Sequence, residues 1–255
     1  MDIVSWLLAS IIVLGAASMQ VLTGFGFALV AVPLLLFIFT GYQAILISMI
    51  LSFCLLLSQA IMERKQAKWL LILRLVFIGF PGLIAGVYIG GVIEPIYVKG
   101  IVGLTIVSYV VIQLLRQKHK VDEGKKEERL PKGFYLAGLT SGALTGAVGI
   151  PGPPVVAVLV GHLSRGAFRA TSVNYFVIQY TLALIFAAVL YTNEFTLSTI
   201  RTVLILLIPT FFGYALGYPL RKYINETNFK RLVYGLLILM GAISMFELIK
   251  YLLIT

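Results

Sequence analysis

The sequence predicts an all-α integral membrane protein of two inverted-topology repeats, each a broken helical hairpin followed by three transmembrane helices. Three observations carry this prediction: the apolar composition, glycine-rich breaks in two overlong apolar runs, and a match between the halves of the chain. Of 255 residues, 60% are hydrophobic and 12% are charged, whereas soluble domains average about 45–50% and about 25%. The chain therefore needs lipid as its main solvent, which excludes soluble enzymes, nucleic-acid binders and disordered proteins.

Eight apolar runs follow one another along the chain. Six of them have the length of about 20 residues that one transmembrane helix needs; they cover 42–61, 69–93, 96–115, 170–191, 197–219 and 232–254. The other two runs, 3–39 and 133–161, are too long for one straight crossing of about 30 Å.

Glycine-rich breaks divide the two long runs. The first break reads TGFGF over residues 23–27, and the second reads GIPGPP over residues 149–154. Glycine permits a positive φ and proline removes a backbone donor, so neither break continues an ordinary helix. The segments that follow, 27–39 and 154–161, are too short to cross the membrane alone. We therefore expect each long run to form a helical hairpin with its tip inside the membrane, or a pair of short helices.

The two halves of the chain match at an offset of about 125–131 residues. The first half is residues 1–115 and the second is residues 133–255, and the charged linker 116–132 joins them. The matched positions occur in the same order in both halves, which favours a repeat over chance. They include Gly24 with Gly149, Ala44 with Ala170, Arg74 with Arg201, Gly86/Gly90 with Gly213/Gly217, and Lys99 with Lys230.

The distribution of basic residues sets the expected topology. Loops 62–68, 116–132, 162–169 and 220–231 hold 16 of the 20 Lys and Arg residues, and basic loops collect in the cytoplasm. The linker 116–132 is then cytoplasmic, and both termini lie outside the inner cell membrane. The first hairpin enters from outside and the second from inside, so the repeats are inverted. Transporters of this plan bind their substrate near the membrane midplane.

The breaks have the chemistry of an anion site. A helix end leaves backbone N–H groups without intrahelical partners, and the N-terminal end carries partial positive charge. We expect helices to begin near Phe27 and Pro154, with N-termini directed inward from opposite sides. In the alternative interpretation, small residues only let helices pack closely. We expect that packing role for the pairs Gly86/Gly90 and Gly213/Gly217.

Polar side chains in apolar surroundings are candidates to assist the backbone. The repeat register pairs Gln20 with Thr145 and Ser48 with Asn174. Isolated serine and threonine side chains also bond to a carbonyl of their own helix, which is the competing interpretation for such residues. The predicted substrate site comprises Gln20, Thr23, Gly24, Phe25, Gly26, Phe27, Ser48, Thr145, Gly149, Ile150, Pro151, Gly152, Asn174 and Gln179.

Three arginines are candidates for a vestibule or a gate. Arg74 and Arg201 either snorkel to lipid headgroups, which is the interpretation we favour, or attract anions to the site. Arg169 flanks the second hairpin and is the candidate gate residue. No Asp or Glu lies in the middle of a crossing, and the sequence contains no metal-ligand cluster, nucleotide-binding loop or catalytic triad. We therefore expect no enzyme, no metal and no cofactor.

The two break motifs resemble the paired glycine-rich signatures of the sulfite exporter TauE/SafE family, also called TSUP. The resemblance covers essentially the whole chain, including the repeat, the linker and the number of helices. It implies a membrane permease for sulfur-containing anions, in which Gly24, Gly26, Gly149 and Gly152 are the break glycines. Phe27-Ala28 and Pro151 stand where glycine is common in the family, and we expect Phe27 and Pro151 to narrow the site.

The sequence thus predicts a transporter of sulfur-containing oxyanions, such as sulfite or the sulfonate sulfoacetate, working by alternating access at a midplane site. A carrier of carboxylates or of another inorganic anion is the alternative, and a non-transporting membrane scaffold is a third hypothesis. The expected partners are a small anion and the lipid bilayer, and no nucleic acid. The sequence leaves open the substrate, the direction, the coupling ion, and the choice between monomer and homo-oligomer.

Overall fold

A computed structural model describes residues 2–92, 133–159 and 163–220, with scattered single positions between 97 and 108 and between 242 and 253. The linker 116–132 and most of the predicted crossings 96–115 and 232–254 lie outside the described residues. The regular elements within the continuous stretches are all helical: α1 (Ile3–Thr23), α2 (Phe27–Leu35), α3 (Gly41–Glu63), η1 (Arg64–Gln66), α4 (Trp69–Val92), α6 (Phe134–Val148), α7 (Gly152–Leu159), α8 (Arg165–Leu190), η2 (Thr192–Glu194) and α9 (Leu197–Leu220).

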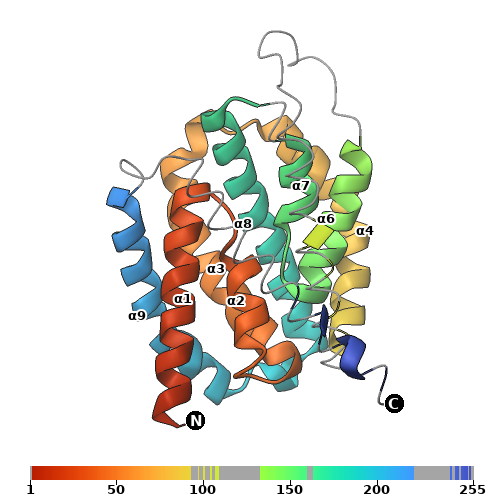
Figure 1. The fold of residues 1–255 in the computed structure, drawn as a ribbon. Helices are drawn as coiled ribbons and strands as arrows, with labels where there is room; N and C mark the ends of the chain where they lie inside the picture. The colour runs from red at the N-terminus through yellow and green to blue at the C-terminus, as the bar shows by residue number, and fades with distance from the viewer. Residues whose placement is uncertain are drawn as a thin grey trace.

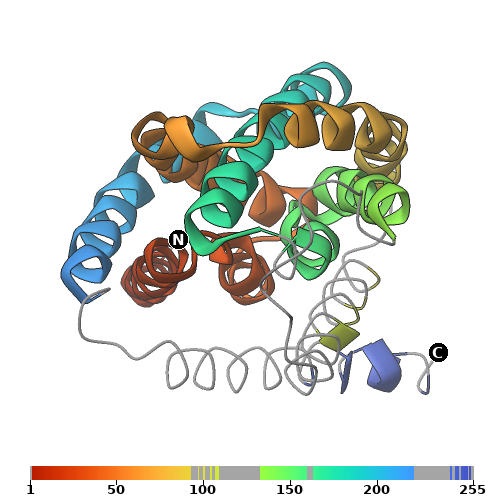
Figure 2. The same cartoon turned by 90° about the horizontal axis from the view of Figure 1, so that it is seen from above.

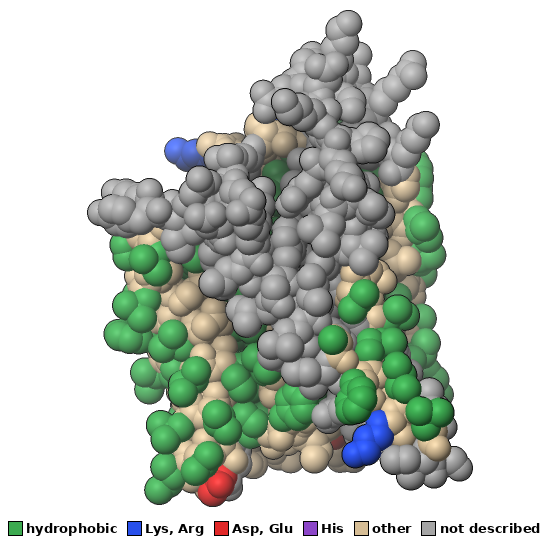
Figure 3. Space-filling view, viewed as in Figure 1, with side chains coloured by type: hydrophobic (Ala, Val, Ile, Leu, Met, Phe, Trp, Pro, Cys, Tyr) green, Lys and Arg blue, Asp and Glu red, His purple; other side chains and the backbone are tan. Residues whose placement is uncertain are grey.

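Five of these helices, α1, α3, α4, α8 and α9, are long and apolar enough to cross a membrane. Large apolar side chains point outward from them, among them Phe77, at 79% exposed, and Ile208, at 75% exposed. Figure 3 shows such side chains covering the flanks of the described surface, with charged side chains near its two ends. A monomeric soluble protein seldom exposes apolar surface on this scale. The prediction of an all-α, multi-pass membrane protein is confirmed.

Both overlong runs are broken at the predicted positions. α1 ends at Thr23, and Gly24 and Gly26 follow with φ of 80° and 109°, values that a side chain rarely tolerates. α6 ends at Val148, and Gly149 caps it with φ of 67°. α1 has 21 residues and α2 has 9, so the first hairpin joins one full-length helix to one short helix. Figure 1 shows the short helices α2 and α7 beside α1 and α6.

The second short helix, α7, begins at Gly152, two residues before the start expected at Pro154. Pro153 and Pro154 therefore occupy its first turn. The N–H groups of a first turn have no intrahelical acceptor, so the two prolines remove no helical hydrogen bond there. They do remove two backbone donors from the break.

Glycines bring the supporting helices into backbone contact. A Cβ on Gly86 of α4 would collide with the carbonyl oxygen of Ala143 on α6, and one on Gly213 of α9 would collide with that of Leu14 on α1. Figure 2 shows the two resulting pairs, α4 beside α6 and α9 beside α1. The packing role predicted for these glycines is confirmed.

The remaining long helices, α3 and α8, pack against each other at the centre. Ile45 and Met49 of α3 and Tyr175 and Tyr180 of α8 are fully or almost fully buried. α2 packs on α3 and α7 packs on α8. Both breaks are thereby held against the same central pair of helices.

Candidate substrate site between the helix breaks

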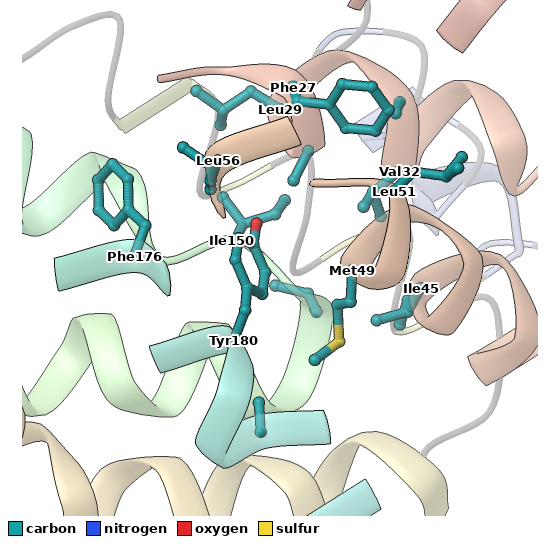
Figure 4. Close-up of a cluster of buried hydrophobic side chains, with 14 of the residues drawn as sticks. Phe27, Leu29, Val32, Ile45, Met49, Leu51, Leu56, Ile150, Phe176 and Tyr180 are labelled. Atoms are coloured by element: carbon teal, nitrogen blue, oxygen red, sulfur yellow. The ribbon is translucent and has the colours of Figure 1, made fainter. Parts of the chain in front are cut away.

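A small cavity lies where the two breaks meet. Its volume is about 20 Å³, which is room for about one water molecule. The cavity is lined by Gln20, Phe25, Gly26, Phe27, Ala28, Leu29, Leu56, Ile150, Pro151, Gly152, Phe176 and Tyr180. Figure 4 shows apolar side chains of this wall, among them Leu56, Ile150 and Tyr180, within a cluster of buried hydrophobic residues. Two segments about 125 residues apart in sequence thus line one cavity.

Gln20 is the polar residue that α1 contributes to this cavity. Its side chain is 2% exposed, and its Oε1 accepts a hydrogen bond from the N–H of Phe27 at 2.9 Å. That bond fixes the orientation of the amide, so the other atom is the donor Nε2. This Nε2 is buried and has no hydrogen-bond partner among the described residues. Buried donors are nearly always paired in native proteins, so Nε2 is a donor available to a ligand.

The N-terminus of α2 provides backbone donors beside Gln20. The N–H groups of Phe27, Ala28 and Leu29 have no acceptor within the helix, and all three residues line the cavity. The first intrahelical bond of α2 runs from Val30 N–H to the Gly26 carbonyl at 3.3 Å. Gln20 occupies the N–H of Phe27, which leaves the next two N–H groups as the main-chain donors of the first break. The partial positive charge of a helix N-terminus acts in the same direction.

The second break is poorer in donors than the first. Pro151, Pro153 and Pro154 have no N–H group, and the N–H of Ile150 is bonded to the Leu144 carbonyl at 3.2 Å. Gly152 contributes the remaining N–H of this stretch. The backbone donors that the sequence led us to expect from both breaks are therefore unequally shared.

Tyrosine hydroxyls cover the carbonyl end of α6. Tyr180 Oη donates to the Gly149 carbonyl at 2.8 Å, and Tyr42 Oη donates to the Gly146 carbonyl at 3.5 Å. The C-terminal end of a helix carries partial negative charge, which repels an anion. The two hydroxyls, one from α8 and one from α3, offset that repulsion.

A chain of buried side-chain hydrogen bonds holds the second break from behind. Gln179 Nε2 donates to Tyr175 Oη at 2.7 Å, Tyr175 donates to Ser141 Oγ at 3.0 Å, and Ser141 donates to the Pro151 carbonyl at 2.5 Å. Gln179 is thus outside the cavity lining and acts on the break through two intermediaries. The chain fixes the position of Pro151, which does line the cavity.

The other polar side chains predicted for the site are also outside the lining. Asn174 Nδ2 donates to the Ala170 carbonyl at 2.8 Å, and Thr145 Oγ1 donates to the Ser141 carbonyl at 2.6 Å. Each bond stays within one helix, which agrees with the alternative that isolated polar side chains bond to a carbonyl of their own helix. Ser48 is buried on α3 and its hydroxyl has no partner in the described part of the chain.

Two glycines of the predicted site form its turns. Gly24 and Gly149 adjoin the cavity without lining it, and Gly149 packs against Ile45 and Met49 of α3. The side chain of Thr23 lies outside the described part of the structure.

Sequence reasoning missed five lining residues of α2, α3 and α8, which are Ala28, Leu29, Leu56, Phe176 and Tyr180. In the sequence they are ordinary members of apolar runs, which are typical of helix packing. The one available signal was the hydroxyl of Tyr180, which needs a partner when buried.

The three predicted arginines have different surroundings. Arg74 on α4 and Arg201 on α9 are exposed and do not line the cavity. Arg169 near the start of α8 is 12% exposed, and its Nη2 lies 2.6 Å from Glu63 Oε1. Its side chain also covers Gly24 of the first break. Among the described residues no cluster of three His, Cys, Asp or Glu side chains could hold a metal ion.

Comparison with known families gives one match. The family model "Sulfite exporter TauE/SafE" matches residues 8–243. This range includes both breaks and, apart from the first turn of α1, the described helices that surround the cavity. No curated protein and no solved structure matches the chain significantly.

Proposed function

Because the chain belongs to the sulfite exporter TauE/SafE family, we propose that it carries sulfite or a small organosulfonate through the cavity between its two helix breaks. Membership of the family and the long apolar helices make the protein a multi-pass membrane transporter of a small anion. The observation that supports the cavity as the site is the buried, unpartnered Nε2 of Gln20 beside the free N-terminus of α2.

Neutral donors hold the anion in this proposal. The N–H groups of Ala28 and Leu29 and the Nε2 of Gln20 approach from the first break, and Gly152 N–H approaches from the second. A sulfite or sulfonate group has three oxygens that accept hydrogen bonds. Hydrogen bonds to a charged group each contribute about 1.5–3 kcal/mol, so these donors suffice without a lysine or arginine in the middle of the membrane.

Transport follows from two inverted halves, 1–115 and 133–255. The packing is reciprocal, since α4 of the first half lies on α6 of the second and α9 of the second lies on α1 of the first. α3 and α8, which correspond in the repeat, pack on each other. Rocking one half against the other would open the cavity to either side in turn. With room for about one water molecule, the cavity corresponds to a closed arrangement that must widen around an anion.

The proposed topology keeps the linker 116–132 in the cytoplasm and both termini outside the inner membrane. The basic loop 62–68 meets the first turns of α8 at one end of the molecule, where Lys68 N–H donates to Thr171 Oγ1 at 3.0 Å. Arg64, Lys65 and Lys68 all belong to this end. The rule that basic loops stay inside favours the cytoplasmic side for it.

Flux through proteoliposomes tests the function. Purified protein is reconstituted, and uptake of radiolabelled sulfite is measured with and without internal unlabelled sulfite, methanesulfonate or acetate. We expect saturable exchange with sulfite and the sulfonate, and loss of exchange in Gly149→Leu, whose side chain would meet Met49. Faster exchange with acetate would favour the carboxylate carrier. Absence of any flux, together with a stable protein partner in pull-downs, would favour the scaffold.

A further inference from the structure

An ion pair closes one side of the first break. Arg169 of α8 and Glu63 at the end of α3 meet with 2.6 Å between Nη2 and Oε1, and their side chains are 12% and 23% exposed. A pair this sheltered from water is screened less than a surface pair. It joins the two central helices, α3 and α8, at the end of the molecule that carries loop 62–68.

The arginine side chain lies directly on the break. A Cβ built on Gly24 would be 2.8 Å from Arg169 Cγ, 3.4 Å from Cδ and 3.6 Å from Nε. The neighbouring Phe168 ring stands edge-on to the ring of Phe25, with 6.4 Å between their centroids. Phe25 lines the cavity. Arg169 and Phe168 together therefore cover the break on the side of loop 62–68.

The edge of the guanidinium group that meets Glu63 is only half used. Arg169 Nε is buried and has no hydrogen-bond partner in the described part of the chain, although its Nη2 is paired with Glu63. An arginine presents N–H groups in a fixed planar fork that matches the oxygens of a carboxylate or a sulfonate. A buried donor of a permanently charged group without an acceptor is unusual. An anion at this position would satisfy it.

The opposite side of the membrane has no such charge at the equivalent position. In the repeat register, Arg169 falls on Gln43 of α3. Gln43 Nε2 donates to Thr199 Oγ1 at 3.2 Å, a bond between two neutral groups. The charged contact is therefore specific to one of the two sides.

From these observations we infer that Arg169 is an anion contact between the cavity and the loop 62–68 side, and that Glu63 competes with the anion for it. The inference rests on the proposed function, since the anion is the one carried through the cavity. While Glu63 is paired with the guanidinium group, Arg169 covers Gly24, and the cavity is closed toward loop 62–68. An arriving oxyanion takes the place of the carboxylate on the fork, which frees α8 from α3 and opens the path to the cavity.

Three substitutions test this competition: Glu63→Gln, Arg169→Gln and Arg169→Lys. Each purified variant is titrated with methanesulfonate by thermal shift, and the half-saturating concentration of sulfite exchange is measured in proteoliposomes. We expect Glu63→Gln to bind about tenfold more tightly, because the competing carboxylate is gone. Arg169→Gln and Arg169→Lys should bind about tenfold more weakly, the lysine because it lacks Nε and the planar fork. Arg74→Gln, which removes an exposed arginine, is the control and should bind like the wild type.

The double variant Glu63→Gln/Arg169→Gln separates competition from stabilisation. If Glu63 acts through Arg169, the tighter binding of Glu63→Gln disappears in the double variant. A purely structural ion pair gives lower thermal stability in both single variants and a half-saturating concentration equal to that of the wild type, which overturns the inference and leaves the transport proposal intact. A wild-type protein without saturable exchange refutes the transport proposal, and the inference with it.

Discussion

Replacing Gln20 with methionine tests the anion site most directly. Gln20 has one paired atom, Oε1 on the N–H of Phe27, and one unpaired atom, Nε2. Methionine has a similar length and removes both. The loss of the acceptor leaves the N–H of Phe27 unpaired at a cost of about 1–3 kcal/mol, while removal of the unpaired Nε2 relieves a penalty of similar size. We expect the free energy of unfolding to change by less than about 1 kcal/mol.

Anion binding should respond far more than stability does. A hydrogen bond from Nε2 to a charged sulfonate contributes about 1.5–3 kcal/mol, and each 1.4 kcal/mol is about a factor of ten in affinity. Gln20→Met should therefore raise the half-saturating concentration of sulfite by about 10-fold to 100-fold. The assay is sulfite exchange in proteoliposomes, with methanesulfonate titrated by thermal shift as a direct measure of binding.

Gln59→Met is the matched control. Gln59 is buried on α3 at 1% exposed, and neither its Oε1 nor its Nε2 has a partner in the described part of the protein. It does not line the cavity. The same substitution should raise thermal stability there and leave exchange unchanged. Wild-type exchange in Gln20→Met, or an equal loss in Gln59→Met, would refute the assignment of Gln20 to the site.

Three further substitutions probe the surroundings of the cavity. Tyr180→Phe uncovers the Gly149 carbonyl, and we expect sulfonate binding in thermal shift to weaken by about threefold to tenfold; tighter binding would contradict the capping role. Gly149→Ala puts a Cβ at φ of 67°, where strain costs about 1–2 kcal/mol, so its melting temperature should fall. The control is Gly15→Ala, whose added Cβ has nothing within 4 Å; its melting temperature should equal or exceed that of the wild type. Gly86→Val would force α4 from α6, and size-exclusion chromatography should show little folded protein; a normal yield would argue against backbone contact there.

The positions of the breaks could be predicted because they depend on local backbone chemistry. Gly24, Gly26 and Gly149 adopt positive φ, which glycine reaches without a steric penalty. The two overlong apolar runs also indicated that a second helix must begin after each break, because one straight helix of that length would exceed the thickness of the membrane. The same holds for Gly86 and Gly213, because the small-residue pattern of close helix packing is visible in a sequence.

The side chains around the cavity were harder to predict, because the direction of a helical residue depends on how its helix is rotated. Gln179 and Tyr180 are neighbours in sequence but point about 100° apart around α8. Gln179 reaches the second break through Tyr175 and Ser141, while Tyr180 reaches the cavity. Because Gln179 is polar, the sequence favoured it over Tyr180 as the ligand contact. A single sequence does not fix the rotation of α8 about its axis, and that rotation decides which of the two side chains faces the cavity.

The two breaks also differ in a way that their shared glycines conceal. Three prolines deprive the second break of donors, two tyrosines cover its carbonyls, and the bonds from Ser141 hold it in place. The first break keeps two N–H groups at the start of α2 and an unpartnered amide on Gln20, and Arg169 of the second half covers it on the side of loop 62–68. In the proposed mechanism the anion is therefore bound mainly by the first break, and the second break forms the rigid opposite wall of the cavity. Most donors at the cavity belong to the first half, and Gly152 N–H is the one from the second, so we expect the anion to stay with the first half while the second half moves across it.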